Sequence, residues 1–108
     1  MSGDESLWWL YLLDCDGRLY TGISTDPQRR YQEHLSGGTK GARFTRAASK
    51  LTMVWLMQVG DRSLALQAEY RLRRLRRGQK LEVISRVADL ATLLDLLNLN
   101  SARPERRL

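Results

Sequence analysis

Trp9-Leu10-Tyr11 and Tyr20-Thr21-Gly22, joined through Asp14-Cys15-Asp16-Gly17-Arg18, form the segment around which this chain is organised. Both outer parts are short and rich in aromatic and branched residues, which favour β-strands. The Asp-Gly step between them is among the stronger local signals for a two-stranded hairpin. The segment therefore predicts two antiparallel strands, over residues 8–13 and 19–23.

A helix is predicted directly after the hairpin, because Asp26 is a good N-cap and Pro27 suits the first helical position. Helical spacing puts Arg30 and His34 one turn apart, on one border of the buried stripe. The stripe itself is expected to comprise Pro27, Tyr31 and Leu35, with Arg29, Gln32 and Glu33 facing outward.

The second half of the chain predicts one more strand and further helices. Residues 39–49 are small and basic and suggest a loop with a short helix, whereas 51–59 form an apolar run typical of a central or well-covered strand. A long helix follows over residues 62–77, with Gly78 as its stop signal. Residues 79–84 are ambiguous between helix and strand, with helix favoured. The residues that indicate a last amphipathic helix are Val87, Leu90, Leu93, Leu94 and Leu97.

This order of elements, β-β-α-(α)-β-α-α, predicts a fold of the α+β class. No internal repeat or composition change divides the sequence, so residues 1–97 are expected to form a single domain. Residues 98–108 show no periodicity and contain three arginines, and they are expected to form a basic, flexible tail.

Composition narrows the class of protein. The 108 residues carry 18 Lys and Arg against 12 Asp and Glu, and only three of the cations are Lys, so the positive charge consists almost entirely of guanidinium groups, which suit bidentate contact with phosphate. With one cysteine and one histidine, the chain can form neither an internal disulfide nor a zinc site of several thiolates or imidazoles. Cys15, at the hairpin turn, is expected to be an exposed thiol.

The N-terminus predicts neither export nor membrane insertion. Residues 1–6 are acidic and lack the basic region of a signal peptide. The apolar run over residues 7–13 is too short to span a bilayer. We therefore expect a cytoplasmic protein with no membrane partner.

Five polar side chains stand out along the chain: Tyr11, Tyr20, Arg30, His34 and Glu69. Taken singly, each has an ordinary interpretation. Tyrosines on paired strands are more often packing residues, and Glu69 with Arg73 is an i,i+4 pair worth about 0.3–0.5 kcal/mol. Glu69, however, lies at the edge of the apolar stripe of its helix, where its carboxylate can reach the sheet. All five in this order indicate a shared site.

The two extended runs that contain these residues resemble the GIY-YIG nuclease superfamily, in particular its small bacterial stand-alone members. The first run reads Tyr-Thr-Gly-Ile-Ser-Thr-Asp-Pro-Gln-Arg-Arg-Tyr-Gln-Glu-His over residues 20–34. The second reads Val-Gly-Asp-Arg-Ser-Leu-Ala-Leu-Gln-Ala-Glu-Tyr-Arg over residues 59–71. The resemblance, which covers about residues 7–80, implies a three-stranded antiparallel sheet flanked by helices and divalent-metal-dependent hydrolysis of phosphodiester bonds.

The resemblance also implies roles for single residues. Tyr11 and Tyr20 fall on the two motif tyrosines, Gly22 on the motif glycine, Arg30 on the helix arginine, His34 on the position one turn later and Glu69 on the metal-binding glutamate. There are three departures from the family pattern. Trp9-Leu10-Tyr11 stands in place of Gly-Ile-Tyr, Ile23 where some members have Lys, and Leu81 where repair and restriction members often have Asn.

The chemistry of phosphodiester hydrolysis fits this set. The reaction needs an activated water and neutralisation of the charge that develops on the phosphate oxygens. Glu69 could hold one Mg²⁺ (or Mn²⁺), because Mg²⁺ keeps most of its waters and takes another ligand from the phosphate. Arg30 could clamp the phosphate. Tyr11, Tyr20 and His34 could each move the proton, and the sequence leaves all three open as the general base.

The arginines expected to bind nucleic acid are Arg43 and Arg46 in the loop and Arg71, Arg73, Arg74, Arg76 and Arg77 in the long helix. Such contacts are made to backbone phosphates and are nearly blind to base sequence. The chain contains no recognisable targeting module. Specificity is therefore expected for the structure of the nucleic acid, or to come from a partner protein.

The leading hypothesis is a metal-dependent endonuclease that acts on DNA in repair or processing, with RNA as the alternative substrate. A second hypothesis, motivated by Leu81 and by the absent targeting module, is a non-catalytic nucleic-acid-binding module with a degenerate nuclease site. A third is an adaptor whose basic helix docks an acidic partner protein.

Overall fold

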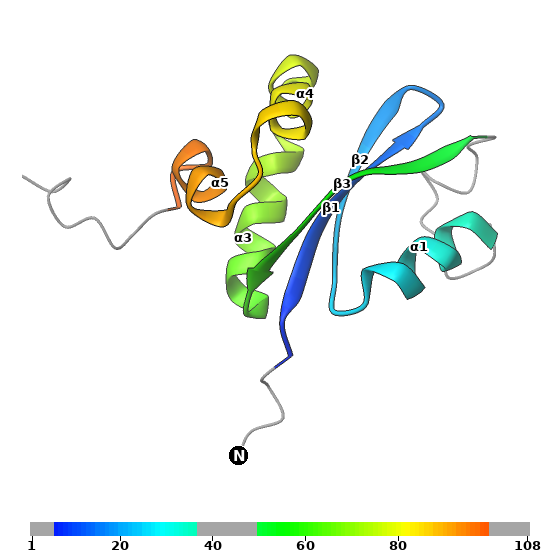
Figure 1. Ribbon diagram of the computed structural model, residues 1–108, viewed down its shortest axis with the longest axis horizontal. Coiled ribbons are helices and arrows are strands. Elements are labelled where there is room, and N and C mark those ends of the chain that lie inside the picture. The colour runs from blue at the N-terminus through cyan, green and yellow to red at the C-terminus, as the bar shows by residue number, and fades with distance from the viewer. Residues whose placement is uncertain (1–5, 37–49, 100–108) are drawn as a thin grey trace, which may run out of the picture.

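A three-stranded antiparallel sheet forms the centre of the computed structural model, which describes residues 6–36 and 50–99 (Figure 1). The strands are β1 (Trp8–Cys15), β2 (Arg18–Ser24) and β3 (Leu51–Gly60), in the order β2-β1-β3. The helices are α1 (Pro27–Ser36), α3 (Arg62–Arg73), α4 (Arg77–Arg86) and α5 (Leu90–Leu96). Helix α1 lies on one side of the sheet and α3, α4 and α5 lie on the other (Figure 1). The predicted α+β class and the three-stranded sheet are confirmed.

The hairpin closes at the Asp-Gly step, as the sequence predicts. Cys15 pairs with Arg18, so Asp16 and Gly17 are the two turn residues, with φ angles of 55° and 92°. A two-residue turn of this kind needs positive φ at both positions, which Asp and Gly tolerate. The backbone N–H of Gly17 donates to Asp14 Oδ1 over 2.6 Å, which fixes the turn further. Both strands are longer than predicted and run right up to this turn.

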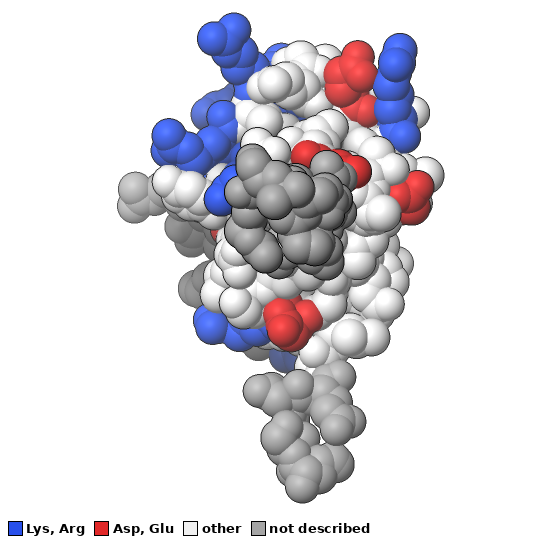
Figure 2. All heavy atoms as spheres, turned by 90° about the vertical axis from the view of Figure 1, so that its left-hand side faces the viewer, with Lys and Arg blue, Asp and Glu red and all other residues white. Residues whose placement is uncertain are grey.

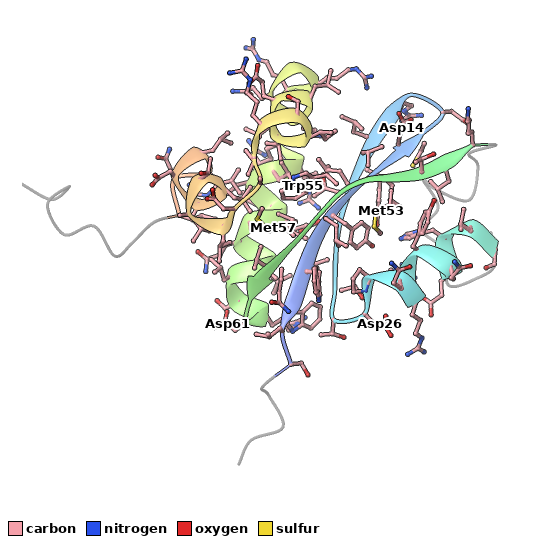
Figure 3. The ribbon with its side chains drawn as sticks, viewed as in Figure 1. Asp14, Asp26, Met53, Trp55, Met57 and Asp61 are labelled. Atoms are coloured by element: carbon pink, nitrogen blue, oxygen red, sulfur yellow. The ribbon has the colours of Figure 1, made fainter. Side chains whose placement is uncertain are left out.

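The third strand lies at an edge of the sheet, so of the two predicted alternatives, central or well covered, it is the well-covered one. β1 occupies the centre and pairs with both β2 and β3. The apolar run of β3 arises because both of its faces contact apolar residues. Trp55 and Met57 point towards α3, whereas Met53 points towards α1 (Figure 3). An apolar run therefore does not distinguish an edge strand that is covered on both sides from a central one.

The sheet separates two apolar cores. The larger core lies against α3, α4 and α5, and its buried residues are Leu10, Leu12, Trp55, Met57, Val59, Ala65, Ala68, Leu72, Val83, Val87, Leu93 and Leu97. The smaller core lies on the α1 side and contains Tyr11, Leu13 and Cys15. Successive strand residues alternate between faces, so Cys15 follows Tyr11 and Leu13 inward. Cys15 is 2% exposed and burial raises its pKa to about 11, so the prediction of an exposed thiol is wrong.

The predicted long helix over residues 62–77 is two helices. α3 ends at Arg73 with Arg74 as its C-cap, and α4 begins at Arg77, so Gly78 lies inside α4 instead of ending a helix. The break lets the partly buried Leu75 pack against the larger core and brings Val83 into it. At the new start, the backbone N–H of Arg76 donates to Gln79 Oε1 over 3.2 Å. The ambiguous segment over residues 79–84 is helical, as favoured.

The last helix is shorter than its apolar spacing suggests. Val87 is the C-cap of α4, and its carbonyl accepts a hydrogen bond from Trp55 Nε1 over 3.1 Å. Asp89 caps α5 by accepting from the N–H of Thr92 over 2.8 Å. Among the described residues, no helix is both long and apolar enough to cross a membrane. The short helix expected within residues 39–49 lies outside the described residues, as do residues 100–108 of the tail expected over 98–108. Leu99, which was expected in that tail, packs against the larger core.

Candidate active site

Tyr11 sits at the centre of β1 and crosses over the backbone of β2. Its partner in the strand register is Gly22, and a Cβ atom on Gly22 would lie 2.4 Å from the Tyr11 hydroxyl oxygen. Real carbon and oxygen atoms do not approach so closely, so only glycine leaves room for the ring. Gly22 therefore fixes where the Tyr11 hydroxyl is placed, and Tyr11 is 1% exposed there.

Replacing Gly22 with alanine is expected to displace the Tyr11 ring and to open the β1–β2 pair. Inserting one methyl group into a packed site typically costs about 1–3 kcal/mol. Thermal unfolding should show that loss. Gly78→Ala is the control, because a Cβ at Gly78 would meet nothing within 4 Å. Equal stability of the two variants would contradict the close approach.

His34, on α1, is buried against both tyrosines. Its Nε2 lies 3.2 Å from the Tyr11 hydroxyl, and its ring centroid is 6.2 Å from that of Tyr11 and 5.5 Å from that of Tyr20. Burial and the nearby charge of Arg30 lower the pKa of His34 to about 4. At neutral pH the imidazole is therefore uncharged, so Nε2 can accept the hydroxyl proton of Tyr11.

This depressed pKa makes stability depend on pH. In the unfolded chain His34 binds a proton below its ordinary pKa of 6.5, whereas in the folded chain it stays neutral until about pH 4. Acidification in that window therefore favours the unfolded state. His34 should remove about 2 kcal/mol of unfolding free energy between pH 7 and pH 5. Denaturant unfolding of wild type and His34→Gln at both pH values checks this, since the variant should show a smaller difference. Identical differences would contradict it.

Arg30, one turn before His34, faces the same two tyrosines. Its Nη1 donates to Glu33 Oε1 over 2.8 Å, and its side chain is 29% exposed. Burial raises the pKa of Tyr11 to about 12, Tyr20 adds to the rise, and the Arg30 guanidinium opposes it by its charge and a hydrogen bond. Burial likewise raises the pKa of Tyr20 while Arg30 lowers it. Among the cations, Arg30 thus has the largest lowering effect on the pKa of both hydroxyl groups.

The outward faces of α1 differ from the prediction at two positions. Glu33 is half-buried because it holds Arg30, and it also pairs with Arg29 Nε over 3.4 Å. Leu35, expected in the buried stripe, is 46% exposed. The inward side of α1 is formed by Pro27 and His34. Glu33 is the site residue that sequence reasoning missed, and its i,i+3 spacing from Arg30 was the available signal.

Glu69 approaches the site from the opposite layer. Helix α3 packs against β1 and β2, and the carboxylate of Glu69 raises the pKa of both Tyr11 and Tyr20. Its side chain is 19% exposed and accepts from Arg73 Nη1 over 3.3 Å. The exposed pair Glu82–Arg86 has the same i,i+4 spacing and distance, but there the carboxylate is 58% exposed. Glu69 therefore differs from the acid of an ordinary surface pair. The five residues predicted for the site lie in one region of the fold.

Two of the expected nucleic-acid-binding arginines contact different parts of the fold. Arg77 donates to the carbonyl of Gly17 at the hairpin turn, whereas Arg71 donates to the carbonyl of Leu97 over 3.1 Å, next to α5. Arg43 and Arg46 lie outside the described residues. Figure 2 views the molecule from the α5 side and shows Lys and Arg gathered mainly towards the upper left. The break between α3 and α4 thus divides the predicted cluster, with Arg76 and Arg77 on the second helix.

A metal ion bound at this site would have few protein ligands. Within the described parts of the chain, no group of three or more His, Cys, Asp and Glu side chains lies close enough to bind one. Glu69 offers a partly buried carboxylate beside two tyrosine hydroxyls. Mg²⁺ prefers oxygen ligands and keeps several waters, so one carboxylate together with substrate oxygens suits it. The residues present therefore fit a hydrated Mg²⁺ or Mn²⁺.

Comparison with known proteins shows the family of this chain. Residues 7–82 match the family model described as the GIY-YIG catalytic domain. UPF0213 protein YhbQ from Escherichia coli K12 is 50% identical over 91 residues, which are 83% of this chain and 89% of that protein. YhbQ from Shigella boydii serotype 18 gives the same identity and coverage. The solution NMR structure of UPF0213 protein BH0048 from Bacillus halodurans is 32% identical and covers 81% of this chain and 92% of that chain, with a TM-score of 0.48. By the family model, which matches most of its length, the chain belongs to the GIY-YIG family of nuclease domains.

Proposed function

We propose that this protein is a divalent-metal-dependent endonuclease that hydrolyses phosphodiester bonds in DNA and is directed by nucleic-acid structure instead of base sequence. The observation that carries the proposal is the convergence of Arg30, His34 and Glu69 on the hydroxyl groups of Tyr11 and Tyr20. A cation, a carboxylate and a proton acceptor are the groups that phosphodiester hydrolysis needs. A role in DNA repair or processing in the cytoplasm would suit this activity, and a partner protein could supply the targeting.

The geometry favours Tyr11 with His34 as the base. An isolated tyrosinate is costly at neutral pH, because burial raises the pKa of Tyr11 to about 12. Neutral His34, 3.2 Å away, can instead accept the Tyr11 proton while the Tyr11 oxygen takes one from the attacking water. The water oxygen then bonds to phosphorus, the bond to the leaving oxygen breaks, and that oxygen takes up a proton from solvent. Tyr20, whose ring centroid lies 5.5 Å from that of His34, would help to shape the site.

Arg30 and Glu69 would serve to neutralise the negative charge of the phosphate, Arg30 directly and Glu69 by holding a metal ion. Arg30 would bind a non-bridging phosphate oxygen, held in place by Glu33. Mg²⁺ or Mn²⁺, bound by Glu69, would supply positive charge for the developing negative charge on the phosphate. Arg73 would keep the Glu69 carboxylate oriented through its 3.3 Å contact. Arg30 and Glu33 lie on α1, whereas Glu69 and Arg73 lie on α3, so the site depends on the folded sheet between the two helices.

The alternative is a nucleic-acid-binding module that has lost turnover. The observation in its favour is Leu81, which is 43% exposed on α4 and offers no polar group where related nucleases often have Asn. In that case the arginines would bind backbone phosphates, and salt would weaken the binding.

Incubation of the purified protein with labelled DNA tests the proposal. We expect cleavage of single-stranded or branched DNA in Mg²⁺ or Mn²⁺, and none in the presence of a chelator. Duplexes of different base sequence should be cut equally slowly. If no DNA or RNA substrate is cut with either metal while salt-sensitive binding persists, the binding module is the better description.

A further inference from the structure

Tyr70, the residue after Glu69, presents an aromatic ring at the surface of α3. It is 50% exposed, although it lies next to a residue of the candidate active site. Consecutive residues of an α-helix point about 100° apart, so Tyr70 faces a different side of α3 from Glu69. No step of the proposed hydrolysis uses this ring, and Tyr70 belongs to neither of the two apolar cores.

Two arginines flank the ring. The guanidinium carbon of Arg74 lies 5.4 Å from the Tyr70 ring centroid and that of Arg73 lies 5.8 Å from it. Contacts of this kind are worth about 0.5–1 kcal/mol at exposed sites, weak enough for a base to displace one guanidinium group from the ring. Exposed aromatic rings beside guanidinium groups are the means by which proteins bind unpaired bases together with their phosphates.

A groove extends from the ring towards α5. Its volume is about 370 Å³, within the usual range for small-molecule sites, and its lining residues are Tyr70, Arg71, Arg74, Leu75, Leu96, Leu97 and Asn98. No carboxylate is among these residues. Arg71, one of the lining residues, donates to the carbonyl of Leu97 over 3.1 Å, which joins α3 to the end of α5. Leu96, 41% exposed, adds an apolar wall.

Arg73 connects this groove with the candidate active site. Its Nη1 contacts Glu69 Oε2 over 3.3 Å, and the same guanidinium group lies over the Tyr70 ring. A nucleic-acid strand with one phosphate bound in the candidate active site could therefore continue past the Arg73 guanidinium group to Tyr70.

We propose that Tyr70 and the adjoining groove bind an unpaired nucleotide of the nucleic-acid substrate, with the base stacked on the Tyr70 ring and a phosphate at Arg74. This inference rests on the proposed function and specifies its substrate class as single-stranded or branched nucleic acid. In a continuous duplex both faces of each base are covered by neighbouring bases, so the ring has no partner there. An acidic peptide would need the arginines but not the aromatic ring.

Binding measured without cleavage tests this assignment. Fluorescence anisotropy in a chelator would compare a short single-stranded oligonucleotide with a duplex of the same sequence. Tyr70→Ala is expected to weaken binding of the single strand by about 5- to 100-fold, the range for loss of one stacked base. Tyr70→Phe keeps the ring and should stay within about twofold of wild type, and so should duplex binding by Tyr70→Ala. Leu66→Ala, one turn earlier on α3 and 39% exposed, is the matched control.

A second measurement separates stacking from loss of structure. An oligonucleotide containing 2-aminopurine should lose fluorescence when wild-type protein binds, and Tyr70→Ala should abolish that loss at saturating protein. Unchanged binding of the single strand by Tyr70→Ala, or an equal loss for single strand and duplex, would overturn the assignment. Because no step requires cleavage, a protein that stacks bases but cuts nothing would refute the proposed function and leave this assignment standing.

Discussion

Replacing Glu69 with glutamine is expected to lower the rate of DNA cleavage by about 10²–10³-fold. Glutamine keeps the shape of the side chain but removes the only negative charge that acts on both Tyr11 and Tyr20 from α3. Without that charge the proposed metal site has no carboxylate. The fold should be retained, because the lost pair with Arg73 is worth at most about 0.5 kcal/mol.

The chain supplies a matched control for this change. Glu82 pairs with Arg86 over 3.3 Å at the same i,i+4 spacing that joins Glu69 and Arg73. Glu82→Gln should therefore have the same small effect on thermal stability and leave cleavage unchanged. Single-turnover rates of wild type and both variants, measured at several Mg²⁺ concentrations, check this. Equal rates for the two variants would mean that Glu69 is an ordinary surface acid and would remove the main support for a metal-dependent nuclease.

Local sequence signals account for much of the site. The Asp16-Gly17 turn sets the hairpin register, and that register places Gly22 opposite Tyr11. Helical spacing brings Arg30 and His34 to one side of α1. These relations are short-range, so the period of a strand or helix is enough to predict them. The convergence with Glu69 is long-range, and the sequence suggests it only through the position of Glu69 at the edge of its apolar stripe and through the family resemblance.

The features that sequence reasoning missed depend on packing between elements. Arginines are good helix formers, so nothing local between residues 71 and 77 predicts the break of the long helix. At the break, the partly buried Leu75 packs against the larger core, and Val83 of α4 is buried in that core. Cys15 is a different kind of miss. The alternation of Tyr11, Leu13 and Cys15 along β1 was a usable signal for burial, and the nearby turn outweighed it.

The depressed pKa of His34 could not be predicted from the sequence either. It arises because α1 buries the imidazole against the tyrosines and places Arg30 beside it. Both causes disfavour the protonated ring, so a residue that often titrates near neutral pH remains a proton acceptor throughout the physiological range. This places the acceptor next to Tyr11 without adding a second positive charge where Arg30 already acts.

Arg30 and Arg29 provide the second decisive comparison. Both contact Glu33, Arg30 over 2.8 Å and Arg29 over 3.4 Å, but their side chains are 29% and 70% exposed. Arg30→Ala is expected to lower the cleavage rate by about 10²–10³-fold, the effect of removing one preorganised donor to a transition-state oxygen. Arg29→Ala should change it by less than about threefold, because an exposed charge contributes little beyond general attraction to DNA. Arg30→Lys should recover only part of the rate, since an ammonium group lacks the planar fork.

Comparing the loss of DNA affinity with the loss of cleavage rate shows whether Arg30 acts in binding or in the transition state. If Arg30 stabilises the transition state, the single-turnover rate of Arg30→Ala should fall far more than its affinity for uncleaved DNA in a chelator. The pH profile is a further check, because loss of the Arg30 charge removes an interaction that lowers the pKa of both tyrosines. The pKa values of both tyrosines should therefore rise. The pKa of His34, which the Arg30 charge also lowers, should rise from about 4 as well. The acidic limb of the cleavage profile should move to higher pH in Arg30→Ala and stay in place in Arg29→Ala. Parallel losses of rate and affinity in the two variants would show that both arginines merely attract DNA, and the phosphate clamp would have to lie elsewhere.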